Sequence, residues 1–330
     1  MPTSFPTEGK LAVYAAPNAS FQIDSYPLRA PEAGEVLVRI RAAGINPVDW
    51  KVREGYLKDY VSLPRILGSD FAGDVAALGE GVTDFPVATA VYGMKGFGGG
   101  AFAEYTTLAA SSIAPKPASL TYAQAAAVPL AAVTAWHSLF EAGQIQPGQR
   151  VLIHAAAGGV GHFAVQFAKI AGAYVIGTAS ARNEAFVRGL GADEFVDYNA
   201  AKFESVVKPV DLVLDTVGFE VSTRSLDVLK AGGKLVCMVT PPPVEAAAPR
   251  QIQATYTNVQ PTTAILTSIS QCIEDKRVQP HISQTFSLDQ IHEALQANQA
   301  QSTAAKSRWT STTKHTQRQR GTHVPLWHRC

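Results

Sequence analysis

Cysteine and long apolar runs are scarce in this chain of 330 residues, and each shortage excludes a class of protein. The three cysteines, Cys237, Cys272 and Cys330, are too few and too scattered for a disulfide framework or a zinc knuckle. So few and scattered cysteines are typical of proteins in a reducing compartment. No run of about 18 apolar residues occurs, so we expect no membrane span. The N-terminus lacks a basic segment followed by an apolar one, so we predict a cytoplasmic rather than a secreted protein.

Acidic residues are missing after Glu293, although the net charge of the whole chain is only +1. Six of the 28 basic residues follow Glu293, which leaves 22 basic and 27 acidic residues, a net −5, up to that point. The tail, residues 299–330, is rich in Thr, Gln, Arg and His and has no apolar period, so we expect it to be loosely ordered. A basic tail can contact nucleic acid, but a solvated tail is the commoner case, so we predict no nucleic-acid partner.

The strongest motif is Val151–Gly161, which spells VLIHAAAGGVG. A short apolar run ends in small residues and glycines, and a helical pattern follows, which is the context of a dinucleotide-binding fingerprint. A tight turn, a close approach of the backbone to a diphosphate and close packing of helix on strand all favour Gly and Ala. The N-terminus of the helix then offers unpaired N–H groups to the phosphates. The predicted cofactor-binding residues here are Ala157, Gly158, Gly159, Val160 and Gly161.

Two different patterns flank this motif, and the length suits two domains. Before it, short strands with Gly and Pro between them predict a small β-barrel. After it, strands alternate with helices, which predicts an α/β fold with a doubly wound parallel sheet. We expect helices from Pro47 towards Glu54, over 222–229 and over 288–297, strands over 102–108 and 234–239, and an edge strand over 253–259.

The end of the second strand of this sheet favours NADPH over NADH. A site for NADH places Asp or Glu there, about 20 residues beyond the glycines, to bind the ribose 2′-hydroxyl. This chain has no acid in Gly177–Asn183, but it has Ser180 and Arg182. A 2′-phosphate needs a donor and a compensating charge, which these two residues supply.

Several motifs together resemble the medium-chain dehydrogenase/reductase superfamily, in its zinc-free quinone oxidoreductase branch, which includes zeta-crystallin. They are residues 43–49 (AGINPVD), 67–73 (LGSDFAG), 133–136 (VTAW), 155–161 (AAAGGVG) and 191–194 (GADE). The resemblance runs from about Lys10 to Ala297. It implies a GroES-like catalytic domain over 1–121, a Rossmann domain that binds NADPH over 122–262 and a return to the catalytic domain over 263–298, before the atypical tail.

The resemblance also implies that no metal is used. Zinc alcohol dehydrogenases of the superfamily carry Cys where Ala43-Gly44 begins its motif and Gly-His-Glu where Gly68-Ser69-Asp70 stands. Their four structural cysteines are replaced by the cysteine-free stretch 93–103. Without a Lewis acid, hydride delivery to an electron-poor acceptor is easier than alcohol oxidation. The predicted function is therefore zinc-independent reduction of a quinone or an α,β-unsaturated carbonyl by NADPH.

Carried over by resemblance, Asn46 would lie beside the nicotinamide and the active-site water, as both a catalytic and a cofactor-binding residue. Tyr56 falls close to a position where related enoyl reductases keep a proton-donating tyrosine, and Asp49 either acts with Asn46 or only pairs locally. Thr134 would line the diphosphate and Tyr198 the cofactor phosphate. Val217 and Thr240 complete the predicted cofactor site. His137 and His154 are expected in the core. The substrate pocket would involve Tyr56, Tyr60, Phe97 and the loop 240–243.

Two alternatives remain open. One is an enoyl-thioester reductase, and the other is a catalytically idle NADPH-binding protein of the crystallin type, with a structural or RNA-binding role. Relatives are often homodimers that join sheet edges, so the expected edge strand over 253–259 is a candidate dimer contact.

Overall fold

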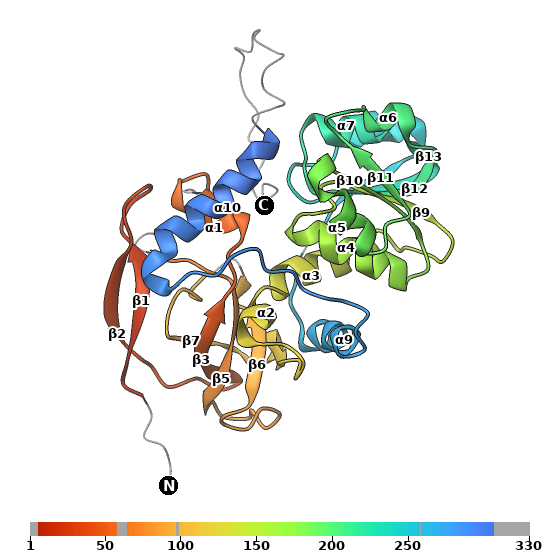
Figure 1. The fold of residues 1–330 in the computed structure, drawn as a ribbon. Helices are drawn as coiled ribbons and strands as arrows, with labels where there is room; N and C mark the ends of the chain where they lie inside the picture. The colour runs from red at the N-terminus through yellow and green to blue at the C-terminus, as the bar shows by residue number, and fades with distance from the viewer. Residues whose placement is uncertain (1–5, 58–64, 97–98, 258, 307–330) are drawn as a thin grey trace. The chain divides into compact units, whose positions relative to one another are not determined.

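The structure, a computed structural model, describes residues 6–57, 65–96, 99–257 and 259–306. These residues fold into two compact units (Figure 1). Unit 1 holds the described residues up to 129, residues 261–267 and those from 282 onwards, and unit 2 holds 130–260 and 268–281. The first boundary lies at 129 instead of 121 because helix α2 (Tyr122–Ala126) contacts the strands of unit 1. Residues 268–281 join unit 2, where the backbone of Gln279 is hydrogen-bonded to the side chain of Gln166.

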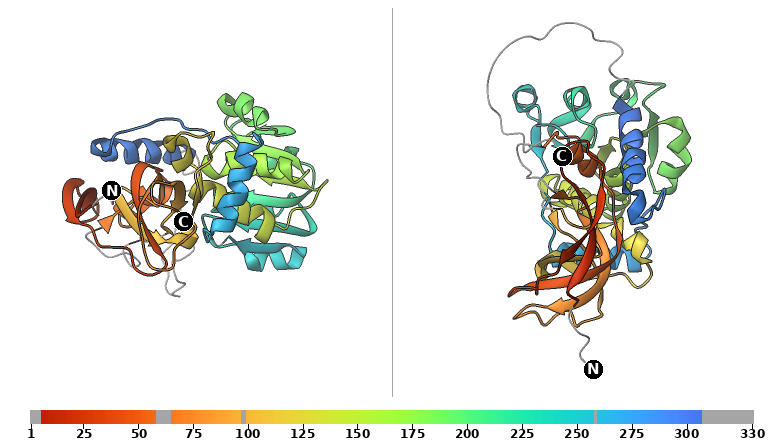
Figure 2. Two further views of the ribbon diagram at one scale, coloured as in Figure 1. Left: turned by 90° about the horizontal axis from the view of Figure 1, so that it is seen from below. Right: turned by 90° about the vertical axis from the view of Figure 1, so that its left-hand side faces the viewer.

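Unit 1 is built on antiparallel strands, which run from red to orange in both views of Figure 2. One sheet has the order β2 (Gln22–Pro27), β1 (Glu8–Tyr14), β4 (Arg65–Ile66). The second has the order β7 (Tyr105–Ala109), β3 (Glu35–Ala43), β5 (Asp70–Leu78), β6 (Ala90–Met94), β8 (Ile113–Pro115). The predicted strand over 102–108 thus begins only at Tyr105. The amide of Ala12 donates to the carbonyl of Phe102, so β1 also bonds to the chain just before β7.

Helix α1 (Pro47–Arg53) begins as predicted, because Pro47 occupies its first turn and Asn46 precedes it in an extended conformation. It contacts the C-terminal helix α10 (Ile291–Lys306), which follows the short 3₁₀ turn Leu288–Gln290. The side-chain amide of Gln299 donates to the carboxylate of Glu54, the C-cap residue of α1. The prediction of a loose tail from residue 299 is therefore wrong for 299–306, which continue the helix. The rest of the tail, 307–330, lies outside the described residues.

Unit 2 contains a six-stranded parallel sheet in the order β11 (Glu194–Asp197), β10 (Tyr174–Ala179), β9 (Arg150–Ile153), β12 (Val210–Asp215), β13 (Leu229–Cys237), β14 (Gln253–Tyr256). Counted from β9, this is the order 3-2-1-4-5-6, so the predicted doubly wound fold is confirmed. The predicted edge strand is β14. The predicted helix over 222–229 is wrong at both ends, because α7 spans Glu220–Ser225 and Leu229 already belongs to β13.

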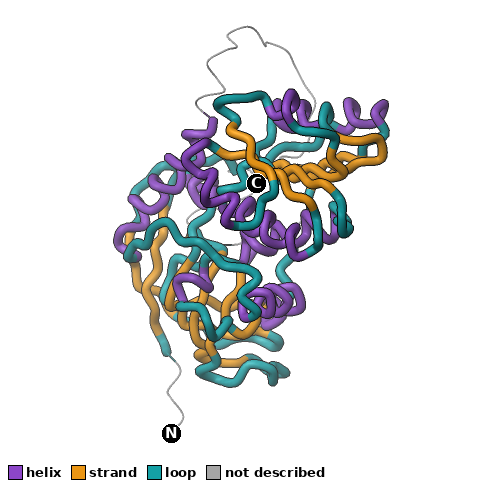
Figure 3. Tube along the Cα trace, turned by 45° about the vertical axis from the view of Figure 1, so that its right-hand side comes forward, coloured by secondary structure: helices purple, strands orange, loops and turns teal. Residues whose placement is uncertain are grey.

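Helices lie on both faces of this sheet (Figure 3). α4 (Gly159–Ile170) and α5 (Glu184–Gly189) contact β9–β11 on one face. α6 (Phe203–Val206) and α7 contribute Phe203 and Val221 to an apolar core on the other face. α8 (Val244–Ala247) and a 3₁₀ turn at Ala248–Arg250 precede β14. α3 (Pro129–Trp136) continues as a π-helix over His137–Ala142, and α9 spans Thr263–Glu274.

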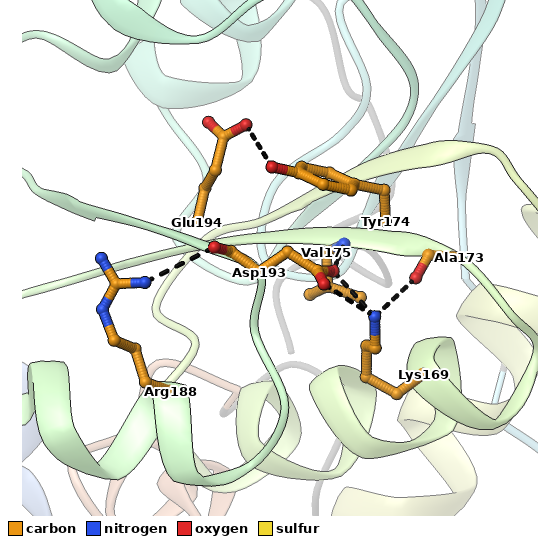
Figure 4. Close-up of polar contacts among 7 residues, drawn as sticks. All are labelled: Lys169, Ala173, Tyr174, Val175, Arg188, Asp193 and Glu194. Carbon is orange, nitrogen blue, oxygen red and sulfur yellow. Dashed lines mark hydrogen bonds and ion pairs between the residues drawn. The ribbon is translucent and has the colours of Figure 1, made fainter.

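The GADE motif, residues 191–194, forms hydrogen bonds to α4 and to β10 in unit 2. Figure 4 shows the carboxylate of Asp193 accepting from the ammonium of Lys169 on α4 and from the backbone N–H of Val175 on β10. The next residue, Glu194, accepts from the hydroxyl of Tyr174. This motif therefore holds α4 against β10, and α4 is the helix whose N-terminus ends the glycine-rich turn.

Candidate active site

The glycine-rich turn follows β9, and its three glycines have different surroundings. A Cβ on Gly161 would lie 2.2 Å from the carbonyl oxygen of Ala155, so only glycine lets α4 approach the strand this closely. A Cβ on Gly158, the N-cap of α4, would lie 3.1 Å from the same oxygen, and a Cβ on Gly159 would meet nothing within 4 Å. Gly159 thus lies beside open space at the N-terminus of a 12-residue helix. The turn fits the diphosphate of a dinucleotide.

The end of β10 carries the two residues predicted to select the cofactor. Ser180 is half-buried and N-caps the 3₁₀ turn Ala181–Asn183, and its hydroxyl accepts from the side-chain amide of Asn183 at 3.1 Å. Arg182 is exposed and makes no ion pair among the described residues. Gly177, earlier in β10, is required by packing, because its Cβ would lie 2.7 Å from Val187.

The remaining predicted cofactor residues are spread over unit 2. The hydroxyl of Thr134 donates to Leu130 in its own helix, and Tyr198 is half-buried just after β11. Val217 and Thr240 follow the ends of β12 and β13. The backbone N–H of Val217 donates to Asp215, and the hydroxyl of Thr240 accepts from the N–H of Phe219. Alongside Ala157, Gly158, Gly159 and Val160, these two residues occupy the carboxyl ends of neighbouring strands.

A buried polar network supports these strand ends, and sequence reasoning missed most of it. The His154 ring lies 3.2 Å from the hydroxyl of Thr178 and 3.0 Å from that of Ser225. Ser225 donates its own proton to the carbonyl of Val221, so His154 must donate from Nε2 and accept at Nδ1. Burial lowers the pKa of His154 to about 4, so the ring is neutral at pH 7. His154 and His137 are both buried, as predicted.

Asp215 and Cys237 end neighbouring strands close to this network. The Asp215 carboxylate is fully buried and accepts from the hydroxyl of Ser222 and from the N–H groups of Val217 and Gly218. Burial and the nearby Asp215 charge raise the pKa of Cys237 to about 12. The only sequence indication of the Asp215 role was its place at the end of an apolar strand.

In unit 1, Asn46 is the centre of a second group of polar residues. Its side-chain amide donates to the buried carboxylate of Asp70 at 3.0 Å, and its backbone N–H donates to Asp49 at 2.8 Å. Asp49 also accepts from the backbone N–H of Gly68 at 3.1 Å. A Cβ on Gly44 would lie 2.3 Å from the carbonyl oxygen of Ala126, which explains that glycine. Asp49 thus links α1 to Gly68. Asp70, which the sequence indicated only as part of the stretch that replaces Gly-His-Glu, orients Asn46.

Tyr56 lies beyond the end of α1 and is 63% exposed. Its ring meets Trp50 edge-on, with 6.0 Å between the ring centres. No hydrogen bond joins Tyr56 to Asn46, whose side chain and backbone N–H bond to Asp70 and Asp49. Of the other predicted pocket residues, Tyr60 and Phe97 lie outside the described residues, whereas the loop 240–243 follows β13.

Two features bear on metals and membranes. In the part of the chain that the structure describes, no three His, Cys, Asp or Glu side chains are grouped so that they could hold a metal ion. In the same part, no helix has the length and the apolar character needed to cross a bilayer.

Comparison with protein families matches two parts of the chain. Residues 32–118 match the family described as "Alcohol dehydrogenase GroES-like domain". Residues 190–307 match the family described as "Zinc-binding dehydrogenase".

Similar proteins cover most of the chain. The mitochondrial NAD(P)H oxidoreductase RTN4IP1 of Danio rerio is 32% identical over 325 residues, which covers 84% of this chain and 82% of that protein. The quinone oxidoreductase of Coxiella burnetii is 33% identical, with a TM-score of 0.81 over 88% of this chain and 96% of that one. The CurK enoyl reductase is 25% identical, with a TM-score of 0.82 over 90% and 97% of the two chains.

Proposed function

Because this chain belongs to the quinone oxidoreductase branch of the medium-chain dehydrogenase/reductase superfamily, we propose that it reduces a quinone or an α,β-unsaturated carbonyl with NADPH. An oxidoreductase with a nicotinamide cofactor is what its relatives support directly. The choice of NADPH, the acceptor and the roles of individual residues are our proposal. The observation that carries it is the open space at Gly159 on the N-terminus of α4, with Ser180 and Arg182 at the end of the next strand.

The residues present fit the cofactor. The N–H groups at the start of α4, around Gly158–Val160, would hold the diphosphate, with Thr134 and Tyr198 nearby in the proposed site. Ser180 and Arg182 would hold the 2′-phosphate, because a hydroxyl donates to it and a guanidinium neutralises it. Val217 and Thr240 would line the site at the ends of β12 and β13. When bound, NADPH supplies the hydride.

The acceptor would be oriented in unit 1 by Asn46. A side-chain amide has two N–H donors, and the bond to Asp70 uses one of them. The second N–H would donate to the acceptor oxygen, where negative charge develops when hydride is added. Asp49 fixes the backbone of Asn46 and so keeps this donor in place. No metal is part of this proposal, because the motif that begins at Ala43-Gly44 lacks the cysteine of the zinc-dependent relatives, and Gly68-Ser69-Asp70 stands where they carry Gly-His-Glu.

Reduction of an alkene needs a proton in addition to the hydride. Tyr56 is the proposed donor, and its high exposure allows it to exchange protons with water. Similarity to the CurK enoyl reductase favours a second candidate, an enoyl-thioester reductase that would use the same residues. The idle crystallin-type alternative predicts that the cofactor binds without turnover.

The test is oxidation of NADPH, followed at its absorbance, with quinones, enones, enals and enoyl thioesters, with and without a metal chelator. We expect turnover with at least one class and no effect of the chelator. Binding of NADPH without turnover of any acceptor would favour the idle protein, and failure to bind NADPH would refute the proposal. The cytoplasmic location also stays a prediction, and the Danio rerio relative is named as mitochondrial.

A further inference from the structure

The turn after β12 contains a residue whose backbone conformation and exposure are both unfavourable. Phe219 has φ +59° and ψ −132°, a combination that residues with a Cβ rarely adopt. Its side chain is also 59% exposed to solvent. Glycine at this position would avoid the backbone strain and expose no apolar ring. A phenylalanine here therefore lowers stability in two ways.

The neighbouring residues hold this turn firmly. The buried Asp215 carboxylate accepts from the N–H groups of Val217 and Gly218, and the hydroxyl of Thr240 accepts from the N–H of Phe219 at 3.0 Å. A Cβ on Gly218 would lie 2.9 Å from the same hydroxyl, so the two loops are in close contact. Strain that the surroundings enforce in this way is typical of ligand-binding positions.

The position of the turn indicates which ligand is concerned. β12 pairs with β9, and β9 ends in the glycine-rich turn. β9 and β12 are the strands at which the order of the sheet reverses, and in such sheets dinucleotides bind outside the carboxyl ends of the strands at this point. An exposed aromatic ring at this edge offers a flat apolar surface for stacking.

We propose that the ring of Phe219 stacks on one of the two flat heterocycles of the bound nicotinamide dinucleotide, adenine or nicotinamide, and that the strained turn serves this contact. This inference rests on the proposed function, since it needs the dinucleotide to bind in unit 2. Stacking of a base on an aromatic side chain accounts for roughly five- to a hundred-fold in affinity.

Three variants separate the ring from the strain. Phe219→Ala removes the ring and keeps a Cβ at the strained backbone, whereas Phe219→Gly removes both, and Phe219→Trp keeps a flat ring. Val206→Ala is the matched control, because Val206 is also exposed (52%) but precedes the N-terminal end of β12, whereas Phe219 follows its carboxyl end. The ligands are NADPH, its adenosine half (2′,5′-ADP) and reduced nicotinamide mononucleotide. Binding is measured by titration calorimetry, and unfolding of the ligand-free protein by a thermal melt.

We expect Phe219→Ala and Phe219→Gly to bind NADPH about ten-fold more weakly, while Phe219→Trp and Val206→Ala bind as the wild type does. Phe219→Gly should melt at a higher temperature than Phe219→Ala. Weakened binding of only 2′,5′-ADP identifies adenine as the stacked ring, and weakened binding of only the mononucleotide identifies nicotinamide. Wild-type affinity of both ring-deleted variants for all three ligands would overturn the inference and leave the proposed function standing. A wild-type protein that binds no NADPH would instead refute the proposed function.

Discussion

Arg182 carries a charge that no carboxylate among the described residues neutralises, at the end of the strand next to the glycine-rich turn. We expect Arg182→Ala to weaken binding of NADPH and to leave binding of NADH nearly unchanged, because only NADPH has a 2′-phosphate. Loss of a charge-assisted bond costs about 1.5–3 kcal/mol, or roughly ten- to a hundred-fold in affinity. Titration calorimetry with both cofactors measures this.

The matched control is Arg188→Ala, which removes the same charge from α5, where Arg188 pairs with Glu184. It should not change either affinity. Ser180→Asp should shift the preference further towards NADH, because a carboxylate repels the phosphate and accepts from a free ribose hydroxyl. Equal loss of both cofactors in Arg182→Ala would argue against NADPH as the preferred cofactor.

Asn46 offers a second test on a single residue, in unit 1. Asn46→Ala removes the amide that Asp70 orients, so turnover should fall on the order of 10²-fold, as when an oxyanion donor is lost. Binding of NADPH to unit 2 should change much less. Steady-state kinetics, NADPH titration and a thermal melt of the same variant distinguish this role from a structural one. An unchanged turnover rate would remove Asn46 from the proposed mechanism.

The turn between β9 and α4 permits a paired test within one element. Gly161→Ala places a Cβ 2.2 Å from a carbonyl oxygen, so it should lower both stability, by about 1–3 kcal/mol, and NADPH affinity. Gly159→Ala places a Cβ in open space, so the melting temperature should hold while NADPH binding falls, because the methyl group fills room intended for the diphosphate. Undiminished NADPH binding by Gly159→Ala would show that the diphosphate lies elsewhere.

Elements with strong local indications were predictable from sequence. Pro47 after an asparagine marked the start of α1, and Thr121 with Gln124 forms the capping box that starts α2. The strand–turn–helix around Gly158–Gly161 was indicated by its glycines, and the doubly wound parallel sheet by the alternation of strands and helices. Residues 299–306 were missed because their Gln, Ser, Thr and Ala form no apolar stripe. These residues are helical because they continue α10, whose first turns are packed into the core by Ile291 and Leu295.

The parts of the candidate site that sequence could not supply depend on contacts between distant residues. Asp70 meets Asn46 only because β5 begins beside the start of α1. Asp215 at the end of β12 meets Ser222 on α7 only because of the turn that joins the two elements. The three-residue strand β8 and the π-helix after α3 are set by tertiary packing rather than by a local pattern. The predicted roles of the site residues remain predictions.

For the whole molecule, two buried histidines make stability depend on pH. Burial lowers the pKa of both His154 and His162 to about 4, whereas an exposed histidine titrates near pH 6.5. Below pH 6.5 the unfolded chain therefore binds protons that the folded one does not. As the pH falls from roughly 6 to 4, each histidine should therefore lower the free energy of unfolding by up to about 1.4 kcal/mol per pH unit.

Urea unfolding from pH 4.5 to 7.5 tests this dependence. Carboxylates such as Glu204, whose pKa the bond to Arg224 lowers, lose their contribution as the pH falls towards 4.5 and below, so the slope above about pH 5.5 belongs mainly to the histidines. His162→Gln should reduce the number of protons taken up on unfolding by about one, so that the free energy of unfolding depends less steeply on pH. A stability that does not change from pH 7 to 5 would contradict the burial of these rings.

The edge strand β14 leads to a prediction about assembly. It pairs with β13 on one side, and it is the last strand of its sheet among the described residues. If two copies join these edges, sedimentation should give twice the chain mass of 35.0 kDa. Sedimentation as a single chain at micromolar concentration would exclude this dimer.

The burial of Cys237 bears on whether electrophilic substrates can alkylate the protein's own thiols. Quinones and enones alkylate thiolates, and an enzyme that handles them is exposed to its own substrates at high local concentration. A thiol with a pKa of about 12 stays protonated at pH 7, and the thiol is a much weaker nucleophile than the thiolate. Burial also raises the pKa of Cys272, the other described cysteine. Neither thiol of the described fold is thus an easy target for the electrophiles that the protein is proposed to consume.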